Sequence, residues 1–163
     1  MAQSGTTDGT GGPKDGSSVP IAARWLGGTG ALPFVALLAM TVFGASDWTE
    51  WAGRALALYG AVILSFLGGI QWGLAIANPS EPEEERGPRL AISVVPSLIG
   101  WAALLLPLEI GLYVLAAAYA LVLFLDAQAT MKGEAPAWYP KLRLPLTAVV
   151  MASLVVGALF TAI

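Results

Sequence analysis

Five long apolar stretches, separated by short polar segments, constrain this chain more than any other feature of its sequence. About 20 consecutive apolar residues, with a range of about 17–25, cross the hydrocarbon core of a bilayer as an α-helix. A helix also satisfies its own backbone N–H and C=O groups, which lipid cannot do. The pattern therefore predicts an all-α integral membrane bundle of five transmembrane helices, at residues 21–43, 51–77, 90–106, 110–125 and 144–163.

The composition favours a membrane location. The chain is 56% hydrophobic and 12% charged, whereas a soluble domain is about 45–50% apolar and about 25% charged. Residues 1–19 differ, because they contain scarcely an apolar side chain and cannot offset the entropy of ordering. We expect a disordered cytoplasmic tail there, followed by a transmembrane domain at residues 20–163. The Ala-, Gly- and Leu-rich composition suits a bacterial inner (cytoplasmic) membrane.

Several kinds of chemistry are excluded by missing residue types. The chain has no cysteine and no histidine, which removes disulfides, thiolate nucleophiles, histidine bases and Cys/His metal sites. Its net charge of −3 lacks the basic footprint of a nucleic-acid-binding protein. Asp126 closes the fourth predicted span, so no ionisable group is expected within the membrane. We expect no catalytic residue, metal or cofactor, and no enzyme activity.

The basic residues predict an orientation. Lys and Arg concentrate on the cytoplasmic side of membrane proteins. With five spans, one side of the membrane receives all the basic residues except Arg54: Lys14, Arg24, Arg86, Arg89, Lys132, Lys141 and Arg143. The N-terminus is therefore predicted to be cytoplasmic and the C-terminus to lie outside. The candidate contacts at this inner surface, with lipid head groups or a docked protein, are Arg24, Arg89, Trp138, Lys141 and Arg143.

The second predicted span carries a small residue at every fourth position: Gly53, Ala57, Ala61, Ser65, Gly69, Gly73 and Ala77. Such a stripe lets neighbouring helices approach closely. It predicts either a helix at the centre of its own bundle, which we favour, or a seam with a second copy or another membrane protein.

A polar cluster is expected toward the inner ends of the second and third spans. Gln71 lies about 9 Å from the inner end of its span and Ser97 about 10 Å from that of the next, at about 1.5 Å per residue. Pro96 also frees a backbone carbonyl one turn earlier. These groups predict a cluster of Gln71, Ser93 and Ser97 that acts either as an interhelical clamp or as a substrate or ion site.

Three blocks together resemble a known family: Tyr59-Gly-Ala-Val-Ile-Leu-Ser-Phe-Leu-Gly-Gly-Ile-Gln-Trp-Gly73, Ser93-Val-Val-Pro-Ser-Leu-Ile-Gly-Trp101 and Trp138-Tyr-Pro-Lys-Leu-Arg-Leu-Pro-Leu-Thr147. Their order and spacing resemble the bacterial domain-of-unknown-function family DUF3429, which also includes the eukaryotic transmembrane protein 69. The resemblance implies a small multi-pass membrane protein and carries no catalytic residues. It marks Gln71, Trp72, Pro96, Trp101, Trp138 and Arg143 as the best candidates for the family's function.

Two functions are compatible with these observations. The first is a non-enzymatic structural, scaffolding or assembly protein that packs with other membrane proteins. The alternative is a small transporter or lipid-binding protein with a polar site around Gln71 and the Pro96 kink. A water-filled cavity at Gln71 would favour the alternative, and an exposed small-residue stripe would favour the first.

The predicted orientation has a direct test. Reporter fusions placed within residues 80–88 and after Ile163 should report opposite sides of the membrane, because an odd number of spans separates them. The same side for both would contradict the five-span topology.

Overall fold

The structure, a computed structural model, describes residues 18–77 and 82–162. The tail predicted at residues 1–19 lies almost entirely outside the described residues. The described chain forms five helices: α1 (Ile21–Phe43), α2 (Ser46–Ile76), α3 (Glu83–Ala103), α4 (Leu108–Met131) and α5 (Tyr139–Thr161).

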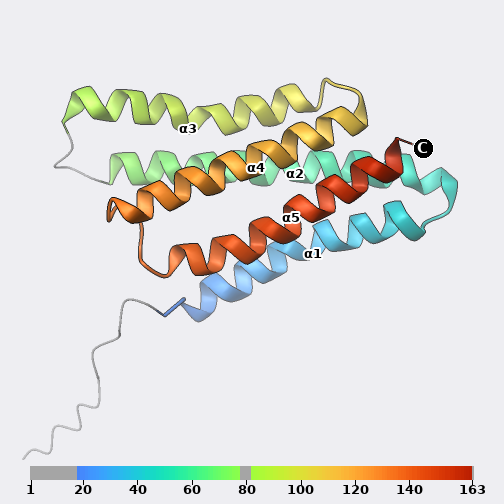
Figure 1. The fold of residues 1–163 in the computed structure, drawn as a ribbon, viewed down its shortest axis with the longest axis horizontal. Helices are drawn as coiled ribbons and strands as arrows, with labels where there is room; N and C mark the ends of the chain where they lie inside the picture. Colours follow the sequence, from blue (N-terminus) through green and yellow to red (C-terminus); the bar gives the residue numbers. More distant parts are fainter. Residues whose placement is uncertain (1–17, 78–81, 163) are drawn as a thin grey trace, which may run out of the picture.

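The helices lie side by side in an elongated bundle (Figure 1). α2 is the central helix, because it contacts each of the other four, whereas α1 and α3 lie on opposite edges and do not touch. This arrangement agrees with the expectation that the second helix is the centre of its own bundle.

Membrane crossing is supported by the length and composition of four helices: α1, α2, α4 and α5. α3 is less apolar because charged residues fill its first two turns, from Glu83 to Arg89. Its apolar part packs along α2. The all-α membrane bundle of five helices is thus confirmed, while the side that each terminus faces stays a prediction.

Three helix boundaries at the predicted inner end of the bundle differ from those of the predicted spans, and one of them is that of α5, which begins at Tyr139 instead of Leu144. α3 begins at Glu83 instead of Leu90, since acidic side chains in the first turn favour a helix N-terminus. α4 does not stop at Asp126 but continues to Met131. A carboxylate ends an apolar span only if it must reach water, and Asp126 is buried among polar partners.

Aromatic side chains pack in the core and also donate hydrogen bonds to backbone carbonyls. Tyr119 of α4 is fully buried, and its hydroxyl donates to the carbonyl of Gly60 in α2 at 2.8 Å. Phe34 of α1 lies between the rings of Tyr59 and Tyr119, at centroid distances of 4.9 and 6.3 Å. These contacts join α1, α2 and α4.

The small-residue stripe on α2 is not buried along its whole length. Ala57 and Ala61 are buried, whereas Ser65 is exposed although its hydroxyl pairs with Ser97 of α3, and Gly69 is exposed as well. The reason is geometric: four residues turn a helix through about 400°, so positions spaced by four drift about 40° per step. The stripe therefore winds from the core at one end of α2 to the surface at the other, so the expectation that it packs within its own bundle is wrong at Gly69.

The neighbouring glycines of α2 offer a matched test. A Cβ on Gly68 would lie 2.5 Å from the backbone oxygen of Ser93, whereas a Cβ on Gly69 would meet nothing within 4 Å. Gly68→Ala should therefore lower the melting temperature in detergent, because α3 must move away from α2. Gly69→Ala should leave it unchanged or raise it, since Ala is about 0.5–1 kcal/mol better than Gly in a helix. Equal melting temperatures for the two variants would contradict the close approach at Gly68.

Candidate functional site

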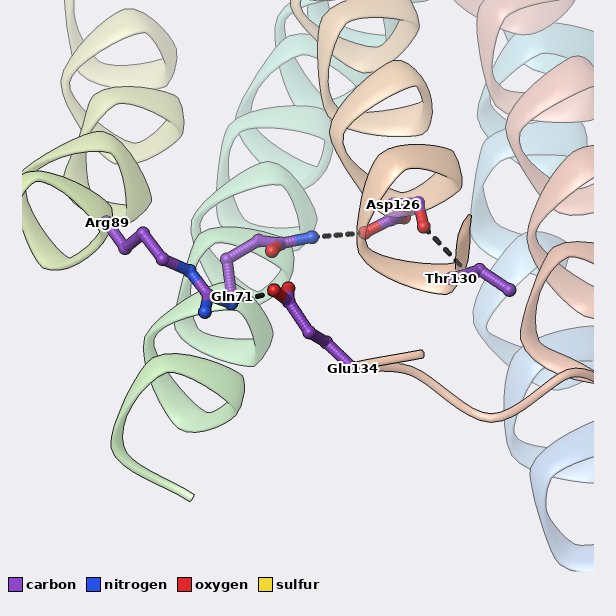
Figure 2. Close-up of polar contacts among 5 residues, drawn as sticks. All are labelled: Gln71, Arg89, Asp126, Thr130 and Glu134. Atoms are coloured by element: carbon purple, nitrogen blue, oxygen red, sulfur yellow. Dashed lines mark hydrogen bonds and ion pairs between the residues drawn. The ribbon is translucent and has the colours of Figure 1, made fainter. Parts of the chain in front are cut away.

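A buried carboxylate, Asp126 of α4, links three helices at the predicted inner end of the bundle. The residue is 2% exposed. Its Oδ1 accepts a hydrogen bond from Gln71 Nε2 of α2 at 2.6 Å, and its Oδ2 accepts one from Arg143 Nε of α5 at 2.7 Å. Figure 2 shows the Gln71 side chain reaching across to Asp126. We call these three residues the inner lock.

The local sequence places each member of the inner lock near a helix end. Asp126 lies in the last turns of α4, where Thr130 donates its hydroxyl to the Asp126 carbonyl at 3.0 Å. Gly133 then turns the chain with a φ of 75°, which favours glycine, and Glu134 N–H bonds to the Ala129 carbonyl at 2.9 Å. This helix ending is typical of a glycine C-cap. It returns the chain to Tyr139, so α5 presents Arg143 to Asp126.

The charges of the inner lock are paired and buried. Both carboxylate oxygens of Asp126 accept charge-assisted or amide hydrogen bonds, and Arg143 is 7% exposed. A buried ion pair of this kind contributes little net stability compared with an apolar pair. Removing one partner is nevertheless strongly destabilising, because the other charge is left buried and unpaired. The lock therefore fixes how α2, α4 and α5 are placed.

Three further polar atoms lie buried on α5 without a hydrogen-bond partner among the described residues: Tyr139 Oη, Arg143 Nη2 and Thr147 Oγ1. Their spacing of four residues puts them along one face of the helix. Burying such groups unpaired costs free energy. This strip extends the polar surroundings of the inner lock along α5.

A second ion pair lies beside the inner lock. Arg89 Nη2 of α3 is 2.7 Å from Glu134 Oε2 in the connection to α5 (Figure 2). Both side chains are about one-fifth exposed, at 23% and 21%. This pair attaches α3 to the end of α4, so ion pairs and the Gln71 hydrogen bond together join four helices at one end of the bundle.

A hollow of about 120 Å³ lies between the second ion pair and Gln71. We call it the inner hollow. α2, α3, α4 and the connection after α4 all contribute to its wall, through Gln71, Arg89, Ile92, Ser93, Leu125, Gln128, Ala129, Lys132 and Glu134. The charged side chains in this wall are the cations Arg89 and Lys132 and the anion Glu134.

The predicted cluster of Gln71, Ser93 and Ser97 is not formed. Ser97 pairs with Ser65 at 2.8 Å, and the Ser93 hydroxyl donates to the Leu90 carbonyl at 2.7 Å. Gln71 and Ser93 line the same hollow, but Gln71 donates to α4 instead of α3. Equal depth in the membrane does not make two side chains meet, because it does not fix the direction in which each one points from its helix. Around the axis of α2, Gln71 lies about 60° away from Gly68, the residue against which α3 packs.

The candidate inner-surface residues divide into three groups. Arg24 and Lys141 are exposed, as a surface contact requires. Trp138 is half-buried and packs edge-on against the Tyr139 ring at 6.0 Å, and Arg89 is engaged with Glu134. Arg143 is buried against Asp126, so its predicted exposure to lipid head groups is wrong.

Sequence reasoning missed Asp126 as a site residue. It was placed at the end of a span, where water would solvate it. The available signal was a single acid in a long apolar segment, with an amide and an arginine at a similar distance from the same membrane face. Ionisable residues inside spans usually pair with each other.

The comparisons with known proteins agree on one family. Residues 19–159 match the family described as "Protein of unknown function (DUF3429)". Transmembrane protein 69 of Xenopus tropicalis is 39% identical over 137 residues, covering 83% of this chain and 53% of that protein. Transmembrane protein 69 of Mus musculus is 31% identical over 137 residues, covering 84% and 55%. The chain thus spans about half the length of these relatives. No solved structure matches.

The inner lock predicts strong coupling between its charges. Asp126→Leu and Arg143→Leu should each lower stability by about 3–5 kcal/mol, because each leaves the other charge buried and unpaired. The double variant should lose far less than the sum of the two, which thermal unfolding in detergent would measure as a double-mutant cycle.

The exposed pair of Glu50 and Arg54 provides the matched control. It has the same 2.7 Å separation, but its side chains are 71% and 66% exposed, and exposed pairs contribute little. A cycle at Glu50 and Arg54 should show almost no coupling. Additive losses at Asp126 and Arg143 would contradict the inner lock.

Proposed function

Since this chain belongs to the DUF3429 family, we propose that it is a non-enzymatic assembly protein of the membrane, which packs against a transmembrane helix of another protein. We also propose the bacterial inner membrane as its location. Its similarity to proteins named transmembrane protein 69 supports the membrane setting, and its Ala-, Gly- and Leu-rich composition supports the bacterial one.

The observation that carries this proposal is the open glycine surface on α2. Gly69 is exposed, and neither it nor Gly73 has an atom within 4 Å of its Cβ position among the described residues. Glycine within a helix costs about 0.5–1 kcal/mol relative to alanine, and no contact within the described chain offsets this cost. Close packing of a second helix does, because small residues let two backbones approach in lipid.

Large apolar side chains extend the same surface. Val62 and Phe66 lie on the Gly69 side of α2 and are 64% and 65% exposed. Together with Gly69 and Gly73 they form what we call the open face of α2. A groove of glycines beside protruding apolar side chains has the shape that accepts a partner helix. The inner lock supports this role by keeping α2 fixed to α4 and α5.

Crosslinking in membranes tests the proposal. A photoreactive residue at Val62 should give an adduct of discrete mass with a partner protein. Gly69→Leu should reduce that adduct several-fold, because the added side chain keeps the partner backbone away, without changing the melting temperature of the purified chain.

The control is the same kind of substitution on another exposed face. Ala120 of α4 is exposed, so Ala120→Leu should leave the Val62 adduct unchanged. An adduct of twice the mass of the chain would identify a second copy as the partner and contradict assembly with another protein. A loss of the adduct in both variants would indicate a general disturbance instead of a specific face.

The alternative of a small transporter is supported by Asp126, because ionisable groups inside spans often belong to ion pathways. Reconstitution into liposomes separates the two functions. The assembly role predicts no proton flux across the vesicle membrane for the purified chain. A flux that Asp126→Asn abolishes, in a variant that still folds, would establish transport instead.

A further inference from the structure

We propose that the inner hollow binds a phosphate group, carried either by an anionic phospholipid or by a free phosphate ion. The proposal does not rest on the packing role of the open face of α2, because the residues that carry it belong to α3, α4 and the connection that follows.

The charge of the inner hollow favours an anion. Arg89 and Lys132 contribute two positive charges, and Glu134 contributes one negative charge that Arg89 already engages at 2.7 Å. The Lys132 ammonium forms no hydrogen bond or ion pair with any described residue. One positive charge is therefore left over within the hollow.

Hydrogen-bond donors are also in place. The Gln128 amide lines the hollow, is half-buried and has no hydrogen-bond partner among the described residues. Lys132 follows it by four residues, so both side chains lie on the same side of α4. An ammonium, an amide and a guanidinium around one space match the several acceptor oxygens of a phosphate.

The size and position of the hollow agree with this ligand. A volume of about 120 Å³ corresponds to roughly four water molecules at about 30 Å³ each, which is enough for one tetrahedral oxyanion. The hollow lies where α2 and α4 end and the apolar part of α3 begins, so we expect it near the level of the lipid phosphates. Basic pockets between helices at the cytoplasmic face bind phospholipid head groups.

The apolar part of the wall of the inner hollow favours a phosphate that is attached to an apolar group, as in a phospholipid. Ile92, Leu125 and Ala129 line the hollow beside the polar groups. Ile92 is 49% exposed, so the apolar wall continues to the lipid-facing surface of α3. A phospholipid would place its phosphate at Lys132 and its glycerol and acyl carbons along this wall.

Thermal unfolding of the full chain in an uncharged detergent tests the proposal. Phosphatidylglycerol is added in one series, phosphatidylcholine in a second and inorganic phosphate in a third, with chloride at matched ionic strength as reference. Phosphatidylglycerol or phosphate should raise the melting temperature saturably. Lys132→Gln should raise the apparent Kd for that probe roughly fivefold, the effect of about one basic contact at a membrane surface.

Two further variants keep the test specific. Gln128→Glu keeps the shape of the side chain and adds a negative charge to the hollow, so it should weaken binding at least as much as Lys132→Gln. Lys141→Gln removes the same charge from an exposed site outside the hollow and should leave the Kd unchanged. All three variants should melt like the unaltered chain when no probe is present, because none removes a buried contact.

The outcomes separate the sources of the phosphate. A response to phosphatidylglycerol alone, weakened in Lys132→Gln, supports a lipid head group, and the same pattern with inorganic phosphate supports a free phosphate. An equal loss of affinity in Lys132→Gln and Lys141→Gln would overturn the proposal in favour of general surface charge. No stabilisation by either anionic probe, or equal stabilisation by phosphatidylcholine in all variants, would overturn it as well.

Discussion

The pairing of Asp126 with Arg143 and Gln71 is the constraint on which the rest of the bundle depends. Apolar contacts between helices in lipid are weakly directional, because lipid tails offer similar contacts. A buried carboxylate has no such freedom, since it must keep its donors or remain unpaired in a low-dielectric environment. α2, α4 and α5 each supply one member, so the rotation and depth of all three helices are set together. The glycine contacts between α2 and α3 then add the fourth helix.

Much of the fold could be predicted from the sequence because lipid leaves the backbone few options. The five helices follow from hydropathy and length alone, and α1 matches its predicted range at both ends. The failures lie where charged residues meet helix ends. A prediction from hydropathy places the end of a helix where the apolar residues stop. In the structure, α3 instead begins among glutamates and α4 continues past Asp126. Backbone hydrogen bonds continue across such residues if the side chain reaches water or a partner.

The candidate site was less predictable, for a reason of geometry. Sequence spacing gives the height of a residue along a helix accurately, and Gln71 and Ser93 do line the same hollow. The direction of a side chain depends on which helix packs against which face, and that is a property of the whole bundle. Gln71 points toward α4, and the small-residue stripe leaves the core along α2. Both follow from the rotation of about 100° per residue around the helix axis. Asp126 could be recognised only together with its partners on two other helices.

The position of the inner lock near the ends of the helices explains how the chain can carry buried charges at all. The cost of a charged side chain in a membrane is highest at the centre of the bilayer, and long side chains near helix ends reach toward the interface. Asp126 lies within two turns of the end of α4, and Arg143 lies in the second turn of α5. The pair can therefore enter the membrane with a modest penalty and become buried only when α4 and α5 pack against each other. Pairing and packing then favour each other at this end of the bundle. The middle of the bundle, where Tyr119 and Phe34 pack, is instead held by apolar contacts and a neutral hydrogen bond.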